Sequence, residues 1–243
     1  MAERAAFLER IRTEVARGRG LFAASTAPRP AHPADAAETI KRQMAERWPE
    51  ALERFKSEFD RIAGVFHRVA GWADVPNVIV DVARQKSATK LVAWEPSILG
   101  FDPRPRLQAE GLSLAVAAAN DIDESVRLRH RDESANAQIG LTGADWVLAE
   151  TGTLILISGR GRPRATSLLP DTHVAVFDRS RLVESLAQVG VLLEALHVEP
   201  ARFMSGAMIN FITGPSRTAD IELTLTRGVH GPKDVHAIFV EAP

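Results

Sequence analysis

The sequence has no cysteine, only 6% aromatic residues and almost no net charge. Without cysteine, the chain can form no disulfide, thiolate zinc site, cysteine nucleophile or protein-held iron–sulfur cluster. Its 30 Lys and Arg residues against 31 Asp and Glu leave a formal charge of −1, which argues against a generally basic nucleic-acid binder. No uncharged apolar run reaches about 18 residues, and charges occur throughout the first residues. We therefore expect a soluble cytoplasmic protein with no membrane span and no signal peptide.

The 243 residues, 45% of them hydrophobic, are enough to bury a sizeable core. Residues 2–16 place apolar side chains at helical spacing, and the Ala-, Pro- and Ser-rich stretch 23–35 predicts a linker. We therefore expect a helical arm with its linker over residues 1–34 and one α/β domain over residues 35–243. An arm of this kind packs on its own core or on a partner subunit, and the second case would make a homo-oligomer.

Short segments rich in Val and Ile alternate with helical patterns from Leu52 onwards. The predicted strands cover residues 64–69, 90–94, 112–118, 145–149, 153–158, 173–178, 205–212 and 235–240. The predicted helices cover residues 50–62, 75–86 and 180–196. Buried strands that alternate with helices predict an α/β fold with a mostly parallel sheet and helices on both faces.

A polar turn, Glu150-Thr151-Gly152-Thr153, separates two of the apolar strands. Gly152 permits a tight turn or the close approach of a ligand, and the two threonine hydroxyls with nearby N–H groups could hold an anion. Glu150 could act as an acid, a base or a nucleophile if it is partly buried. The alternative is a tight hairpin whose Glu faces solvent.

The strand 153–158 ends in a loop that combines glycines with arginines and contains no acid. Ser158 and Gly159 leave backbone amides free, and the arginines at positions 160, 162 and 164 make a local positive field. Such a loop at the carboxyl end of a strand suits phosphate or carboxylate groups. A solvated basic turn is the alternative.

The same loop contains Arg160-Gly161-Arg162-Pro163, which resembles the core of an AT-hook. That module works in extended, disordered tails, whereas this copy lies between an apolar strand and Leu168-Leu169-Pro170. Minor-groove binding also needs additional basic surface, which a net charge of −1 does not offer. We therefore expect no nucleic-acid partner.

A third polar segment begins where the strand 205–212 runs into a glycine turn. Its candidate ligand residues are Gly214, Ser216, Arg217, Thr218 and Asp220. Ser216 or Thr218 would cap a helix that ends at Gly228, Asp220 would lie in its first turn, and Arg217 would strengthen an anion site there. The segment lacks the Lys of a P-loop and the spacing of a dinucleotide turn, so ATP and NAD are not expected. Capping alone is the alternative explanation.

The seven histidines are scattered and form no HxH or HExxH pair, so no metal site is expected. His230 lies in the turn Gly228-Val229-His230-Gly231-Pro232, where it could donate a proton or simply bond a neighbouring carbonyl. His173 opens a buried strand, and we expect it to be structural.

Together these motifs resemble the lactate-utilization protein C (LutC) family, which is built on the LUD domain. The matching stretches are 141–145 with 149–153, then 168–173, 214–222 and 228–232. Their order and spacing fit the family from residue 139 to the end of the chain. The family loop after Ser158 more typically reads Ser-Gly-Pro-Gly, whereas the arginines of this chain add charge.

The resemblance implies a fold similar to the NagB/ribose-phosphate isomerase/CoA-transferase group. It also implies a cytoplasmic role in the oxidation of L-lactate to pyruvate, beside two partner proteins that carry iron–sulfur chemistry. A chain without cysteine fits the member of such a set that holds no cluster.

We therefore predict a cleft for a small anionic ligand, with Glu150 and His230 as catalytic residues and no cofactor. The predicted ligand-binding residues are Thr151, Gly152, Thr153, Ser158, Gly159, Gly214, Ser216, Arg217, Thr218 and Asp220. Two alternatives remain open. The first is a noncatalytic assembly subunit for iron–sulfur partners. The second is a stand-alone enzyme of the same fold group, such as a sugar-phosphate isomerase, a CoA transferase or a folate cyclo-ligase.

Overall fold

The structure, a computed structural model, describes residues 2–17, 30–119, 123–198, 208–219, 225–228 and 230–242. The chain divides into two compact units, residues 1–31 and 32–243. The first unit contains the helix α1 (Ala2–Arg17), which confirms the helix predicted over residues 2–16. One turn of α1 is bridged by an ion pair between Arg12 and Glu9 at 3.1 Å.

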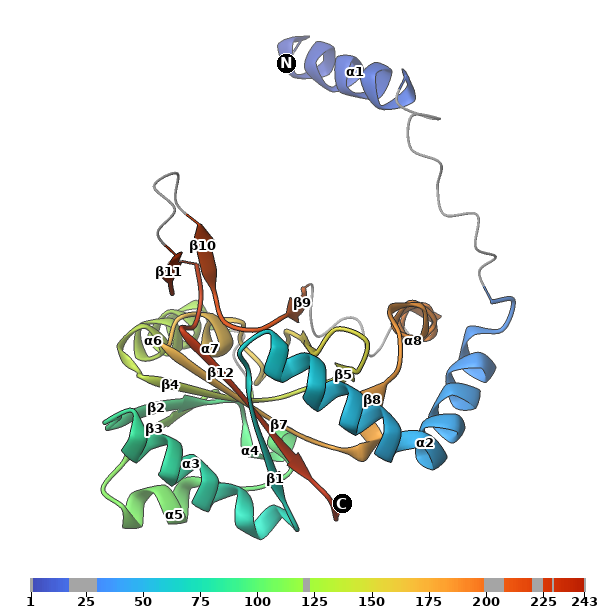
Figure 1. The fold of residues 1–243 in the computed structure, drawn as a ribbon. Helices are drawn as coiled ribbons and strands as arrows, with labels where there is room; N and C mark the ends of the chain where they lie inside the picture. Colours follow the sequence, from blue (N-terminus) through green and yellow to red (C-terminus); the bar gives the residue numbers. More distant parts are fainter. Residues whose placement is uncertain are drawn as a thin grey trace. The chain divides into compact units, whose positions relative to one another are not determined.

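A six-stranded sheet forms the centre of the second unit, and its strands are all parallel in the order β1-β12-β7-β4-β2-β3 (Figure 1). These strands are β1 (Val65–Val69), β2 (Lys90–Ala93), β3 (Ser113–Val116), β4 (Ile139–Gly143), β7 (Thr172–Asp178) and β12 (Asp234–Val240). Nearly every side chain of β4, β7 and β12 is buried. Strands covered on both faces have continuous apolar runs rather than alternating ones. The predicted α/β fold with a mostly parallel sheet is confirmed.

Helices cover both faces of this sheet, with α3 and α5 on one face and α6 and α7 on the other (Figure 1). The helices are α2 (Pro33–Arg61), α3 (Val75–Gln85), α4 (Pro96–Leu99), α5 (Arg104–Ala109), α6 (Glu124–Asn136), α7 (Ala165–Leu168) and α8 (Leu186–Val198). Two short 3₁₀ helices are η1 (Trp72–Asp74) and η2 (Arg179–Arg181). In the described part of the chain, no helix is long and apolar enough to cross a membrane.

The second half of α2 supplies the centre of the core. Phe55 stacks on Phe59 with ring centroids 5.1 Å apart and meets Phe177 of β7 edge to face at 5.6 Å. All three rings are buried, and truncating such a ring to alanine costs about 3–5 kcal/mol. Pro49 lies inside α2, and the helix changes direction along its length (Figure 1). Because proline breaks one backbone hydrogen bond and crowds the preceding turn, it accounts for this bend.

A smaller four-stranded sheet has the order β8-β5-β6-β9. Its strands are β8 (Leu182–Val183), β5 (Trp146–Leu148), β6 (Thr153–Ile157) and β9 (Ile209–Ile212). β5 and β6 form an antiparallel hairpin, and β9 pairs antiparallel with the other edge of β6. A further antiparallel pair joins β10 (Arg217–Ala219) to β11 (Leu225–Arg227).

The structure corrects three predicted elements. The helix expected after Ser216 is wrong, because residues 217–219 and 225–227 are strands. Ser and Thr favour turns as well as helix caps, and the β-branched residues that follow favour strands. The helix predicted over residues 180–196 begins only at Leu186, after η2 and β8. The linker predicted to reach residue 35 overlaps α2, which starts at Pro33, a favourable first position for proline.

Candidate functional site

The carboxyl ends of β2, β4 and β7 lie at one edge of the parallel sheet. β2 has β3 on one side and β4 on the other, so the chain reverses its direction across the sheet between these strands. Open α/β sheets bind ligands in the crevice at such a topological switch point. Charged residues follow each of the three strands here, namely Glu95, Asp145 and Arg179. This edge is therefore the candidate site.

Asp145, just after β4, is fixed by contacts to both of its carboxylate oxygens. The Nη1 group of Arg162 donates to Oδ1 at 2.9 Å, and the amide N–H of Ile157 donates to Oδ2 at 2.6 Å. The side chains of Asp145 and Arg162 are only 17% and 22% exposed. Hydrogen bonds between ionised groups in such a partly buried place are stronger than surface ion pairs. The pair therefore ties the loop after β6 to the edge of the large sheet.

The loop 158–164 is also attached to the end of β2. The amide N–H of Glu95 donates to the carbonyl oxygen of Gly161 at 3.0 Å, and the indole N–H of Trp94 donates to that of Pro163 at 3.2 Å. Within the loop, Gly159 and Arg162 exchange two backbone hydrogen bonds of 3.1 and 2.9 Å. The loop is thus a tight turn held from several sides rather than a free basic tail.

A cleft of about 460 Å³, named here the small cleft, lies between this loop, the end of β3 and the helix α6. Its lining includes four arginines, Arg127, Arg131, Arg162 and Arg164, and one carboxylate, Glu124. Arg131 contacts Asp132 at 3.0 Å and Arg162 is bound to Asp145. Among the described residues, the side chains of Arg127 and Arg164 contact no acid. The small cleft therefore carries an excess of positive charge.

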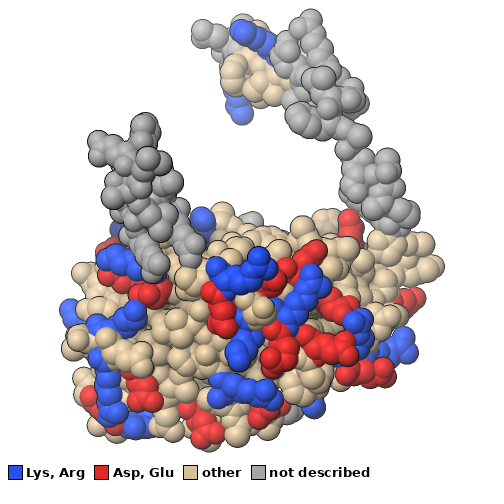
Figure 2. Space-filling view, viewed as in Figure 1, with Lys and Arg blue, Asp and Glu red and all other residues tan. Residues whose placement is uncertain are grey.

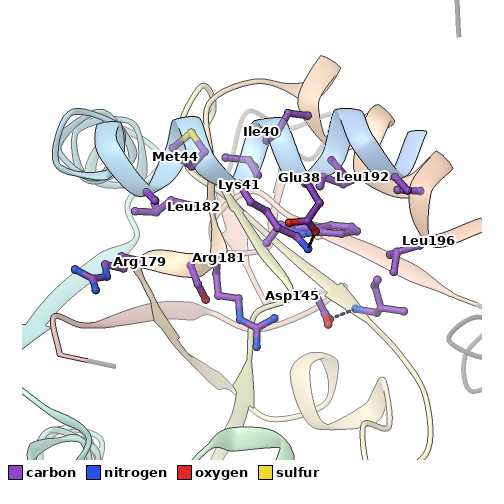
Figure 3. Close-up of a pocket in the computed structure, with 18 of the residues that line it drawn as sticks. Glu38, Ile40, Lys41, Met44, Asp145, Arg179, Arg181, Leu182, Leu192 and Leu196 are labelled. Atoms are coloured by element: carbon purple, nitrogen blue, oxygen red, sulfur yellow. Dashed lines mark hydrogen bonds and ion pairs between the residues drawn. The ribbon is translucent and has the colours of Figure 1, made fainter. Parts of the chain in front are cut away.

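A second and larger space of about 1110 Å³, the large cavity, is lined by both members of the Asp145–Arg162 pair, and Figure 3 shows Asp145 beside it. One wall is apolar and comes from α2 and α8, including Ile40, Met44 and Leu192. Its polar end comes from the ends of β4 and β7 and from the start of α2. Arg162 lines both spaces.

The predicted residue Glu150 lies away from both spaces and contacts the start of α8. The amide N–H of Leu186, the first residue of α8, donates to Glu150 Oε2 at 3.0 Å. A carboxylate at this position satisfies a free helical N–H and interacts favourably with the helix dipole. The catalytic role of Glu150 stays a prediction, whereas its capping contact is observed.

The rest of that turn is packed against the protein itself. Gly152 is buried with φ +66°, and a Cβ there would lie 2.6 Å from the backbone nitrogen of Phe59 in α2. The hydroxyls of Thr151 and Thr153 are 2.6 Å apart, and Thr153 is 2.8 Å from the hydroxyl of Thr213. These contacts bring the first and third predicted segments together and use their hydroxyls internally.

Ser158 and Gly159 lie at the opposite end of β6 from Thr153, about 16 Å away at the usual rise of a strand. Ser158 accepts a hydrogen bond from the side-chain amide of Asn210 at 3.1 Å, and both Ser158 and Gly159 line the small cleft. The second predicted segment is therefore at a different place from the other two.

Ser216 and His230 are brought together in the third segment. The amide N–H of His230 donates to Ser216 Oγ at 3.2 Å, and Gly214 packs against Ile62 at the end of α2. The backbone of Arg217 and Thr218 belongs to β10, and the predicted residue Asp220 lies outside the described residues. The catalytic role of His230 stays a prediction.

Three histidines lie side by side within the large sheet. His67 Nε2 and His236 Nδ1 are 3.0 Å apart, and the fully buried His173 is 2.8 Å from the hydroxyl of Thr142. Burial, reinforced by the neighbouring His236, lowers the pKa of His173 to about 3. Burial, then His67 and Lys86, lowers the pKa of His236 to about 4, and burial also lowers the pKa of His67. These histidines are neutral parts of the core at neutral pH.

Asp145, Arg179 and Arg181 were not among the predicted site residues. The available signal was their position directly after β4 and β7, because the residues that follow buried parallel strands face the ligand crevice. That signal was missed for Arg181 because the predicted helix 180–196 was placed over it.

The fold and this edge define an α/β protein with ligand-sized spaces at the carboxyl ends of a parallel sheet. The LUD domain family model matches residues 52–240, and the chain belongs to the LUD domain family. It is 39% identical over 168 residues to lactate utilization protein C of Halalkalibacterium halodurans, a match that covers 67% of each chain. A DUF162 family protein from Deinococcus radiodurans has the same fold, with a TM-score of 0.52 and 19% identity over 79% of this chain and 98% of that chain.

Two further relatives are matched over shorter stretches. Lactate utilization protein C of a Geobacillus species is 39% identical over 118 residues, or 49% of this chain and 48% of that one. The protein of the same name from Anoxybacillus flavithermus is 42% identical over 110 residues, or 45% and 47%. The match thus spans about half the length of these two relatives.

Proposed function

We propose that this chain is a cytoplasmic component of an L-lactate oxidation system and binds a small organic anion in the small cleft. The observation that carries the anion site is the excess of arginines over acids in a cleft beside the carboxyl end of β3, at the ligand-binding edge of the parallel sheet. Arg127 and Arg164 are the binding residues, because neither is neutralised by a contacting acid among the residues that the structure describes. The role in lactate metabolism is supported by relatives named lactate utilization protein C.

Oxidation of lactate to pyruvate releases two electrons, and a chain without cysteine cannot hold an iron–sulfur cluster through its own thiolates. We therefore assign the electron transfer to iron–sulfur partner subunits. In this arrangement the present chain binds the carboxylate and positions it, and Ser158 and Gly159 shape the wall of the cleft.

Calorimetric titration of L-lactate and pyruvate into the purified chain tests the anion site. We expect Arg127→Ala and Arg164→Ala each to weaken binding about 10–100-fold, the effect of losing one hydrogen bond to a charged group. Arg160→Ala is the matched control, because Arg160 belongs to the same loop but does not line the small cleft. Equal binding by all three variants and the unchanged protein would contradict the site.

Growth on L-lactate tests the role in metabolism separately. A strain without this chain should fail to grow on L-lactate but grow on glucose, and the unchanged protein should restore growth. The double variant Arg127→Ala/Arg164→Ala should fail to restore it. Full growth of the deletion strain on L-lactate would refute the role in lactate oxidation, whatever the titration shows.

A second candidate function, a noncatalytic assembly subunit, is favoured by the exposed apolar edge of the smaller sheet. Phe211 of β9 is 47% exposed and Met208, just before this strand, is 44% exposed. Unpaired edge strands with apolar side chains are suited to docking another protein. If Phe211→Ser abolishes co-purification of iron–sulfur partners while the arginine variants still support growth, assembly is the better description.

A further inference from the structure

The large cavity is not used by the proposed small-anion site, and its two ends differ in chemistry. Aliphatic side chains of α2 and α8 form one wall, among them Ile40, Met44, Leu192 and Leu196. Charged side chains complete the lining: Glu38 and Lys41 come from α2, Asp145 is paired with Arg162, and Arg179 and Arg181 follow β7. Figure 3 shows Asp145 and Arg181 across the space from α2. Clefts that bind organic ligands combine an apolar lining with a few polar groups in this way.

The large cavity is too large to be filled by a single lactate molecule. Its volume of about 1110 Å³ is more than twice the 460 Å³ of the small cleft. Pockets that take drug-sized molecules measure about 300–1,000 Å³. A compact hydroxy acid would leave most of the apolar wall uncovered, so the shape fits a longer molecule.

The charges at the polar end favour an anion. Lys41 is paired with Glu38 at 2.6 Å, and Arg162 is paired with Asp145 at 2.9 Å. The remaining two cations, Arg179 and Arg181, contact no acid within the described part of the chain. In Figure 3, Arg181 reaches toward the space beside Asp145, whereas Arg179 points away from it. Arg181 is therefore the cation placed to meet a ligand.

We propose that the large cavity is a second binding site, for an amphipathic organic anion. Its carboxylate or phosphate head contacts Arg181, and its apolar body lies along the wall formed by α2 and α8. A guanidinium group can bind either head through two parallel hydrogen bonds. Such a ligand differs from the small anion of the proposed function in size and place, so the two sites can be tested independently.

Titration of the full chain with alkanoates from butanoate to decanoate tests this site. Each added methylene buried against the wall should tighten binding about fourfold until the wall is covered. Decyl phosphate, measured beside decanoate, shows which head the site prefers, and either preference supports the proposal. Decanol, which has the apolar body without the charge, should bind at least tenfold more weakly than the better anion. Binding that does not change with chain length, or decanol that binds as well as both anions, would overturn the proposal.

Two variants separate the head from the body of the ligand. Arg181→Ala should weaken the better anion at least tenfold and leave decanol unchanged, while the matched control Arg42→Ala, an exposed arginine on α2 outside the cavity, should change neither. Ala195→Phe, which places a ring into the cavity from the half-buried face of α8, should weaken all long ligands. Lactate binding by both cavity variants should be unchanged, because Arg181 and Ala195 do not line the small cleft. This titration shows that the small cleft is intact in the variants. Unchanged binding of decanoate and decyl phosphate by Arg181→Ala would overturn the assignment of the head group.

Discussion

The turns at the two ends of β6 contain similar kinds of residue but lie in different structural environments. At one end, Glu150-Thr151-Gly152-Thr153 combines a glycine with hydroxyls and a charge. At the other end, the loop 158–164 does the same with serine, glycines and arginines. The first turn packs on α2 and α8, whereas the second borders two ligand-sized spaces.

The difference between the two ends is whether the polar groups already have partners in the protein. The Glu150 carboxylate caps a helix, and the hydroxyls of Thr151 and Thr153 contact each other. In the loop 158–164, Arg162 is paired, but the side chain of Arg164 contacts no acid among the residues described. A polar residue whose hydrogen bonds are all made within the protein has a structural role, whereas a polar residue without such partners is available to bind a ligand.

The largest expected effect is that of Gly152→Ala. The added Cβ would lie 2.6 Å from the backbone of Phe59 at a positive φ of +66°, so either the turn or α2 must move. We expect a loss of about 3–5 kcal/mol in the free energy of unfolding, measured by urea denaturation. Gly190→Ala is the control, because a Cβ at this exposed helical position meets nothing within 4 Å and should stabilise by about 0.5–1 kcal/mol. A folded Gly152→Ala variant of unchanged stability would show that the turn does not need glycine for packing.

The next effect concerns pH and separates folding from anion binding. His173 and His236 have folded pKa values of about 3 and about 4, against an unfolded value of 6.5. The unfolded chain therefore takes up protons first as the pH falls below 6.5, and stability decreases until the folded pKa values are passed. We expect a loss of about 2–4 kcal/mol between pH 7 and pH 5 in denaturation experiments. Arginine stays charged over this range, so binding at the small cleft should hold while the protein remains folded.

His236→Gln provides the control for the pH effect. It removes one titrating group but keeps a side chain that can hydrogen-bond His67, so the decrease in stability between pH 7 and pH 5 should become less steep. A decrease of the same steepness in this variant would show that other groups, such as the Lys86–Asp234 pair nearby, cause the pH dependence.

The smallest effect is expected for substitutions of Glu150. They test most directly whether the two ends of β6 differ in function. Glu150→Ala removes the cap of α8 and should cost about 0.5–2 kcal/mol in thermal or chemical denaturation. Glu150→Gln keeps an oxygen acceptor for the Leu186 amide, so it should lose less stability than Glu150→Ala and restore growth on L-lactate. A folded Glu150→Gln variant that fails to restore growth would support the catalytic role predicted from the sequence and would make both ends of β6 functional.

Much of the fold could be predicted because burial leaves a direct trace in the residue pattern. The apolar runs of β6, β7 and β12 lie within one residue of their predicted bounds. The sequence of α6 has no clear hydrophobic pattern, because the buried residues of this helix are only His130 and Ser134. No helix was therefore predicted there. The first half of α2 was missed because Pro49 interrupts the helical pattern.

The candidate site could be predicted only in part. The basic loop after β6 was identified, and its Ser158 and Gly159 do line the small cleft. Arg181 and Asp145 were missed because their importance depends on which strand ends lie next to each other. Gly214 and Ser216 looked like the start of a helix because turns and helix caps use the same residue types.

By itself, the sequence determined the class of fold and the family, because repeated apolar strands and several uncommon motifs remain readable without coordinates. Only the tertiary structure decided which polar groups are free. That decision depends on contacts between residues far apart in the chain, such as Glu150 with Leu186 and Arg162 with Asp145. A hydrogen bond or ion pair formed across such a distance in sequence leaves no local pattern, yet it determines whether a charged side chain stabilises the fold or remains available to bind a ligand.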